Sequence, residues 1–298
     1  HLHLSLCVSC RRPWYHKKRF TIPISIITII LISAAVTVFF LLPKSQHQPQ
    51  TCTKPYTYGI SYSTGNSPSS VIFSYSTKVA NDTRSLLTVA NQDDNNIIVL
   101  TADKNGIFYT RDFYNTGLSP MTVISADFNN DNKQDLAVTN YFDSTVGILL
   151  GYGDGTFRSQ SVYDTGTTPW SIISADFDND NKSDLAITNV ADNTISVLLG
   201  NGDGTFRNQN IVDTGNTPQS LVSGDFNNDN KPDLAVTNAA DNTVSILLGN
   251  GNGTFRNRTI YKTGVSPQSL VSADFNNDNN MTPVCTRILY SISHFYRT

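Results

Sequence analysis

Acidic and amide side chains recur at alternate positions in one nine-residue motif of this sequence. The copy with the most acids, DFDNDNKSD at residues 176–184, has carboxylates at its first, third, fifth and ninth positions. Like charges this close repel one another unless a cation neutralises them. Alternate oxygen donors in a tight loop, with a backbone carbonyl from the seventh position, match the roughly six to eight oxygen ligands of Ca²⁺. The motif therefore predicts a calcium site.

The motif occurs in three intact copies. Their predicted ligands are Asp127, Asn129, Asp131, Lys133 and Asp135; Asp176, Asp178, Asp180, Lys182 and Asp184; and Asp225, Asn227, Asp229, Lys231 and Asp233. Each lysine is expected to give its backbone carbonyl and to point its ammonium group to solvent. The sixth position, where calcium loops usually have Gly, is Asn in every copy, and Asn tolerates the left-handed conformation that the turn needs.

Two further expectations concern these loops. Because the second copy has four carboxylates and the other two have three, we predict that the second binds calcium most tightly. The competing interpretation is that the copies are Asp- and Asn-rich turns, capped by their own side chains without a metal.

Histidine and glutamate, which often perform catalysis, are missing from residues 48–293. All 24 acidic residues are aspartate, and the five histidines are residues 1, 3, 16, 47 and 294. A Ser-His-Asp triad, a Cys-His pair and a His-ligated zinc site are therefore excluded between residues 48 and 293, and we predict no enzymatic activity. After residue 50 there are 15 basic residues against 24 aspartates, a net charge of −9, which argues against a nucleic-acid partner.

The motif belongs to a longer repeat. Asp127, Asp176, Asp225 and Asp274 are spaced by 49 residues, and a period of this size is typical of solenoids and propellers. Within one unit, four short runs rich in β-branched residues, at 171–177, 184–190, 194–200 and 207–213, predict four antiparallel strands. One such sheet buries its apolar faces only against its neighbours. We therefore predict an all-β fold, a β-propeller of four-stranded antiparallel blades.

The repeats are expected over residues 64–281, which hold a little over four units. An eroded first copy of the repeat is visible at 87–100. The loop that precedes it keeps only Asp82, so no calcium is expected there. In the last copy Asp274, Asn276 and Asp278 are followed by Thr282 at the ninth position, and the repeat is lost in the tail 282–298. We expect either further blades beyond this sequence or a small ring of four or five blades that share strands.

The run DFNNDNKPDLAVTN, followed by TVSILLGNGNGTF, resembles the FG-GAP and VCBS-type repeats, whose relatives form the propeller of integrin α-subunits. The likeness covers about residues 64–280. It implies a β-propeller with calcium in hairpin loops on one rim, at the positions named above, and with ligands bound on the opposite face. No ligand-contacting motif carries over to this sequence.

An apolar segment precedes the repeats. Residues 20–42 contain no charge and, as a helix, are long enough to cross a hydrocarbon core of about 30 Å. Five basic residues in the 1–19 segment predict that the N-terminus is cytoplasmic. We therefore predict a signal-anchor at 20–42, an extracellular stalk at 43–63 and a type II plasma-membrane protein. A cleavable signal peptide, with an apolar region of about 7 to 15 residues, is the competing interpretation.

Three smaller signals occur in the sequence. The sequons at Asn81, Asn252, Asn257 and Asn280 allow glycosylation. The sequence does not decide whether Cys52 and Cys285 form a disulfide. The glycine-rich GYGDGTF is interpreted as a β-turn, because no helix follows to bind a phosphate. The phenylalanines that repeat in register in each GTF are expected in the core of the blades; they are Phe157, Phe206 and Phe255.

These observations lead to a hypothesis of function. We expect a single-pass surface protein whose calcium-binding extracellular β-propeller binds a protein or glycan ligand in cell adhesion. The alternative is a non-catalytic propeller scaffold of a larger extracellular hydrolase or lyase, since similar repeats accompany such activities in some relatives. A third interpretation makes the propeller a passive spacer.

Overall fold

The computed structural model describes residues 27–32, 35–40, 62, 64–76, 85–102, 107–273, 282–287 and 291–293. The chain divides into two compact units, His1–Thr64 and Gly65–Thr298. The predicted stalk and cytoplasmic segment, the first and last copies of the acidic loop, Cys52 and the sequons Asn81 and Asn280 lie outside the described residues.

In the first unit the described residues form one antiparallel hairpin, β1 (Ile27–Ile32) and β2 (Ala35–Phe40), with Ile27 opposite Phe40. Both strands are rich in Ile, Val and Thr, whose branched side chains favour strands. The predicted helix over 20–42 is therefore not confirmed, and its remaining residues lie outside the described part. No helix in the described ranges combines the length and the apolar composition needed to cross a membrane.

The second unit is all-β. Four of its sheets have four antiparallel strands each, in sequence order, and a fifth has three. The strands are β3 (Pro68–Tyr75), β4 (Ser85–Asn91), β5 (Asn96–Ala102) and β6 (Phe108–Asn115); β7 (Pro120–Ala126), β8 (Asp135–Asn140), β9 (Thr145–Leu149) and β10 (Ser161–Asp164); β11 (Pro169–Ala175), β12 (Asp184–Asn189), β13 (Thr194–Leu198) and β14 (Asn210–Asp213); β15 (Pro218–Gly224), β16 (Asp233–Asn238), β17 (Thr243–Leu247) and β18 (Thr259–Lys262); and β19 (Ser269–Ala273), β20 (Thr282–Arg287) and β21 (Ser291–Ser293).

The predicted four-stranded antiparallel blades are confirmed. The expected strands of one unit match β11 to β14 to within three residues at every boundary. Three strands differ by two or three residues, and β13 ends two residues early, at Leu198. β11 begins earlier, at Pro169, where a register shift before Ile172 admits extra residues, and β14 begins later, at Asn210.

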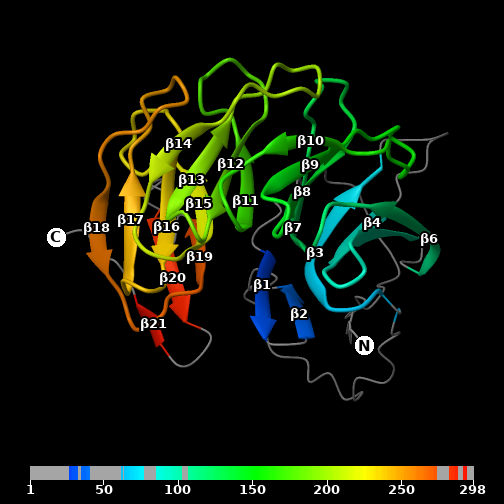
Figure 1. The fold of residues 1–298 in the computed structure, drawn as a ribbon, viewed down its shortest axis with the longest axis horizontal. Coiled ribbons are helices and arrows are strands. Elements are labelled where there is room, and N and C mark those ends of the chain that lie inside the picture. Colours follow the sequence, from blue (N-terminus) through cyan, green and yellow to red (C-terminus); the bar gives the residue numbers. More distant parts are fainter. Residues whose placement is uncertain are drawn as a thin grey trace, which may run out of the picture. The chain divides into compact units, whose positions relative to one another are not determined.

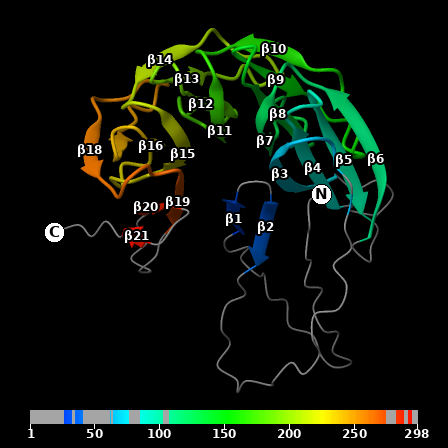
Figure 2. The same ribbon diagram turned by 60° about the horizontal axis from the view of Figure 1, so that its bottom comes forward.

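Successive sheets pack side by side through their first strands, so that β3 lies against β7, β7 against β11, β11 against β15 and β15 against β19. Figures 1 and 2 show this succession. The apolar core lies between sheets: Leu86 and Ile97 of one sheet share a cluster with Val123 and Leu136 of the next. This is a propeller-like arrangement of blades.

The second strand of each four-stranded blade is buried more completely than the alternating pattern predicts. All six residues of β12 are buried, including Ala186 and Thr188 on the face opposite Leu185 and Ile187. The reason is that a neighbouring sheet covers each face. Full burial of a Leu or Ile side chain contributes about 1.5–3 kcal/mol, so these short strands are a large part of what holds the blades together.

Candidate metal centre

The three predicted calcium loops each connect the first strand of a blade to its second. They follow β7, β11 and β15 and end at the ninth-position aspartates Asp135, Asp184 and Asp233, which begin the next strand. Each loop therefore lies at the same end of its blade. The strands fix the two ends of each loop, and the residues between them determine its shape.

Left-handed asparagines give the loops their sharp turns. At the sixth position φ is +60° at Asn132, +61° at Asn181 and +59° at Asn230, which confirms the expected role of Asn there. The fourth position adopts the same conformation, at Asn130, Asn179 and Asn228. This second turn was not predicted, although the fourth position of each of the three loops is Asn, which was a visible signal for it.

The first aspartate of each loop holds the turn closed. The Asp176 carboxylate accepts the backbone N–H of Asp180 at 3.0 Å and that of Asn181 at 2.8 Å. Asp127 and Asp225 accept the equivalent pair of N–H groups. These bonds are of the type that caps an ordinary Asx turn. They shape the loop, but they do not by themselves distinguish a metal site from a turn.

The ninth-position aspartates are fully buried. Asp184 accepts the backbone N–H of Phe177 at 2.8 Å and that of Gly200 at 2.7 Å. Burial raises the pKa of Asp184 to about 6, although both hydrogen bonds favour the ionised form. Burial likewise raises the pKa of Asp135 and of Asp233. A buried carboxylate of this kind is costly unless a positive charge lies close to it.

The second loop brings three carboxylates together. Oxygens of Asp176, Asp178 and Asp184 lie within 4.8 Å of one another. Oδ1 of Asp178 is buried and has no hydrogen-bond partner. Burial, followed by the charge of Asp180, raises the pKa of Asp178. An unpartnered buried oxygen in a cluster of carboxylates fits a hard cation such as Ca²⁺, which would satisfy it and offset the repulsion.

The fifth position of the loop differs from expectation. The Lys182 ammonium group does not point freely to solvent, because it donates to Asp180 Oδ2 at 2.7 Å and lowers the pKa of Asp180. Lys133 makes the same pair with Asp131 at 3.0 Å. These two ion pairs were not predicted. The geometric cluster contains Asp176, Asp178 and Asp184, while Asp180 pairs with Lys182 instead.

The first and second acidic loops also contact the next blade. The backbone N–H of Gly204 donates to Phe128 O at 3.0 Å, and that of Gly253 donates to Phe177 O at 2.9 Å. The rings of Phe128 and Phe206 pack edge to face at 5.7 Å. The GTF phenylalanines therefore lie between blades: Phe157 and Phe206 are buried and Phe255 partly buried, as predicted. The contact between the acidic loop and the following blade was not predicted.

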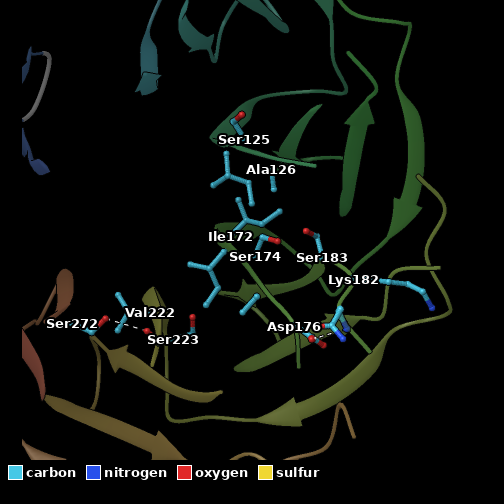
Figure 3. A pocket seen from close by; sticks show the side chains of 14 residues that line it. Ser125, Ala126, Ile172, Ser174, Asp176, Lys182, Ser183, Val222, Ser223 and Ser272 are labelled. Atoms are coloured by element: carbon cyan, nitrogen blue, oxygen red, sulfur yellow. Dashed lines mark hydrogen bonds between the residues drawn. The ribbon is translucent and has the colours of Figure 1, made fainter. Parts of the chain in front are cut away.

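A pocket of about 740 Å³ opens beside the second loop. Figure 3 shows Asp176 and Lys182 at one side of it and Ser174, Ser223 and Ser272 on the first strands of three successive blades. Ser272 donates to Ser223 O at 3.1 Å. The pocket has mixed polar and apolar walls, and its size is that of ordinary small-molecule sites.

Comparison with known families decides what kind of repeat this is. A model described as the FG-GAP-like repeat matches residues 127–187, 176–236 and 225–281. The chain belongs to the FG-GAP-like repeat family. The three matches begin at Asp127, Asp176 and Asp225, the first residues of the acidic loops, so the resemblance noted in the sequence is confirmed.

Solved structures show the fold of this FG-GAP-like repeat protein. A candidate 6-phosphogluconolactonase from Bacteroides uniformis is 14% identical with a TM-score of 0.53, over 78% of this chain and 72% of that one. A protein from Lactobacillus plantarum is 13% identical with a TM-score of 0.50, over 76% and 69%. BBS1N, solved in complex with ARL6DN, is 10% identical with a TM-score of 0.50, over 84% and 66%. At these identities the likeness is one of fold alone. No curated protein matches the sequence.

Proposed function

We propose that the protein is a single-pass cell-surface protein whose FG-GAP-like propeller is extracellular, is stabilised by calcium, and binds a protein or glycan ligand in cell adhesion. The observation that carries the calcium part is the second loop, where three carboxylates converge and Asp178 Oδ1 is buried without a partner. The ligands there are Asp176, Asp178 and Asp184, with the backbone carbonyl of Lys182. The first and third loops bind through Asp127, Asn129, Asp131, Asp135 and the Lys133 carbonyl, and through Asp225, Asn227, Asp229, Asp233 and the Lys231 carbonyl.

Calcium in these loops has a mechanical role. The loop joins two strands of one blade, and its second residue also contacts the next blade, as with Phe177 O and Gly253 N at 2.9 Å. A cation that fixes the loop therefore strengthens the junction between blades. Extracellular modules bind calcium with dissociation constants of roughly 10⁻⁴ to 10⁻³ M, which suffices where calcium is abundant.

The calcium proposal is tested by thermal unfolding of the full chain with a chelator and with calcium. At a concentration about 100 times the dissociation constant, one site stabilises the folded protein by roughly 2.7 kcal/mol. We expect a saturable rise in melting temperature that Asp178→Asn reduces. Asp213→Asn, which changes an exposed aspartate on β14, is the matched control. A melting temperature that calcium leaves unchanged contradicts the proposal.

The membrane and adhesion parts have separate tests. Translation into microsomes should add glycans at Asn252 or Asn257, both exposed. Asn252→Gln with Asn257→Gln should remove the part of the gel-mobility shift that these two sites cause, and replacing Asn81 and Asn280 as well should abolish the shift. A chain that receives no glycan and is digested by added protease has the opposite topology.

Adhesion predicts that cells displaying the full chain are retained on a surface coated with extracellular matrix glycoproteins. Retention equal to that of untransfected cells would refute it.

A further inference from the structure

Three aromatic side chains meet at one junction between blades. Tyr141 and Phe142 lie in the turn between β8 and β9, and Trp170 lies near the start of β11 in the next sheet. The rings of Tyr141 and Phe142 are 5.1 Å apart at 77°, and those of Tyr141 and Trp170 are 5.9 Å apart at 76°. We refer to Leu118, Tyr141, Phe142 and Trp170 as the aromatic patch.

Half of the aromatic patch is exposed, and its backbone is held in place. Phe142 is 69% exposed and Leu118 is 50% exposed. The Phe142 N–H donates to Leu118 O at 3.2 Å, which ties the two sides of the patch together. The Trp170 carbonyl accepts the hydroxyls of Thr122 at 2.7 Å and Thr139 at 3.1 Å from the preceding blade. The backbone that presents these side chains is therefore fixed across the junction.

The repeat itself shows that the fold does not need these aromatics. In the next unit the residues equivalent to Tyr141, Phe142 and Trp170 are Val190, Ala191 and Gln219, and in the following one Ala239, Ala240 and Gln268. Those units form the same strands and turns. Large exposed apolar side chains that the structure does not require are typical of binding surfaces.

The aromatic patch lies at the far end of the blade from the acidic loops. β8 begins at Asp135, which closes the first loop, and ends at Asn140, immediately before Tyr141. β11 begins at Pro169, beside Trp170, and ends where the second acidic loop begins. The two features therefore occupy opposite ends of the same strands, so a ligand on the patch leaves the acidic loops uncovered.

Size and charge point to the kind of ligand. An aromatic side chain buries about 150–250 Å² when covered completely, and two of the four patch residues are already half-buried. The patch thus offers a few hundred Å², well below the roughly 800 Å² per partner of a stable protein–protein interface. A sugar ring fits this area, because its C–H face packs on aromatic rings while its hydroxyls bond at the edge.

The polar group at the edge of the patch is Asp143. Its side chain is exposed and accepts the Leu118 N–H at 2.7 Å. A carboxylate accepts hydrogen bonds from sugar hydroxyls but repels acidic sugars. We propose that the aromatic patch binds a neutral hexose or N-acetylhexosamine residue of an oligosaccharide. This inference rests on the ligand-binding role proposed above and specifies its chemistry and its site.

The repeat supplies the variant that tests this site. Tyr141→Val, Phe142→Ala and Trp170→Gln together convert the junction to the residues of the next unit, so the triple variant should fold with an unchanged melting temperature. The probe is an array of immobilised neutral oligosaccharides of hexoses and N-acetylhexosamines, applied to the full chain with calcium in a detergent without sugar head groups. We expect the variant to lose at least about tenfold in affinity, or 1.4 kcal/mol. The single variant Phe142→Ala should lose part of this affinity, and Ala191→Phe serves as a control that adds an aromatic elsewhere.

A second readout reports on Trp170 directly. The protein has two tryptophans, Trp14 and Trp170, so in Trp14→Phe the intrinsic fluorescence comes from the patch alone. Titration with a bound oligosaccharide should change it saturably. Oligosaccharide binding that the triple variant retains overturns the patch as the site but leaves the adhesion role intact. Failure of the wild-type protein to bind any neutral oligosaccharide overturns the ligand class. Cell adhesion that persists without such binding then indicates a protein ligand.

Discussion

The carboxylate of Asp184, at the start of β12, accepts a 2.7 Å hydrogen bond from the backbone N–H of Gly200, which follows β13. The same carboxylate accepts the N–H of Phe177 at 2.8 Å. One buried side chain thereby joins the acidic loop to the glycine-rich loop that follows β13. Asp135 and Asp233 make the same two bonds in their own blades. The ninth position is therefore structural as well as a predicted metal ligand.

The first prediction separates these two roles. Asp184→Ala leaves two buried N–H groups without an acceptor, which costs roughly 2–4 kcal/mol even when a chelator has removed all metal. Asp184→Asn keeps one acceptor oxygen and should cost less. Urea unfolding in the presence of a chelator measures both, with Asp213→Ala as the exposed control. A loss of stability seen only when calcium is present would show that the residue acts through the metal alone.

A second prediction concerns pH in the absence of metal. Burial raises the pKa of Asp184 to about 6 from an ordinary value of 3.8. Between these values the folded state binds a proton that the unfolded state does not, so the contribution of Asp184 to stability is present below pH 3.8 and is lost as the pH rises through 6. Asp184→Asn does not titrate. The difference in unfolding free energy between wild-type protein and this variant should therefore fall over that range and stay level above pH 7.

The same measurement with calcium should give the opposite slope. Calcium binds the carboxylate and not the acid, so the stabilisation by calcium should grow as the pH rises through 6. A difference between wild-type and variant that rises with pH in the chelated protein would contradict the raised pKa. A flat difference in both conditions would show that Asp184 titrates normally.

The fold could be predicted from the sequence because its signals are repeated. A 49-residue period and turn residues at fixed offsets located β11 to β14 closely. Contacts between units were harder to predict, because nothing local marks them. The bond from Gly204 N to Phe128 O joins residues far apart in sequence, and the GTF motif indicated only that Phe206 is buried. The burial of both faces of β12 was hard to predict for the same reason, since it depends on the neighbouring sheets.

The candidate site, too, could be predicted only in part. The left-handed turn at Asn181 follows from residue type and spacing, and Asn179 offered the same signal. The calcium-ligand positions stay a prediction. The pairing of Lys182 with Asp180 was missed because both residues were assigned to other roles, the carbonyl of one and the carboxylate of the other being counted as ligands. Side-chain rotamers on a short loop decide such a pairing, and a sequence pattern does not specify them.

A third prediction tests the loop backbone. Asn181 has φ of +61°, a conformation that costs a residue with an ordinary Cβ about 1–2 kcal/mol. Asn181→Gly should change stability by no more than about 0.5 kcal/mol, whereas Asn181→Val should cost about 1–2 kcal/mol. Ser183→Val, two residues on and outside the left-handed region, is the matched control. Equal effects of Val at both positions would show that the turn contributes no specific requirement.

The last prediction ranks the three loops and uses Lys182 as the probe. Chains that each keep one intact loop, with Asp→Asn at the first and ninth positions of the other two, allow calorimetric titration of single sites. The second loop should bind calcium most tightly, since it alone has four carboxylates, although Lys182 pairs with one of them at 2.7 Å. The Lys182 side chain is 30% exposed, and pairs of this kind contribute about 0.2–1 kcal/mol. Lys182→Met keeps the backbone carbonyl and removes one competing cation, while Arg207 remains 3.5 Å from Asp178 Oδ2. The variant should therefore tighten calcium binding at the second loop by roughly two- to fivefold. Lys262→Met, on exposed β18, should leave the affinity unchanged.

Weaker binding in Lys182→Met would mean that the ammonium group supports the loop instead of competing with calcium. A second loop that binds calcium most weakly of the three would refute the ranking by carboxylate number.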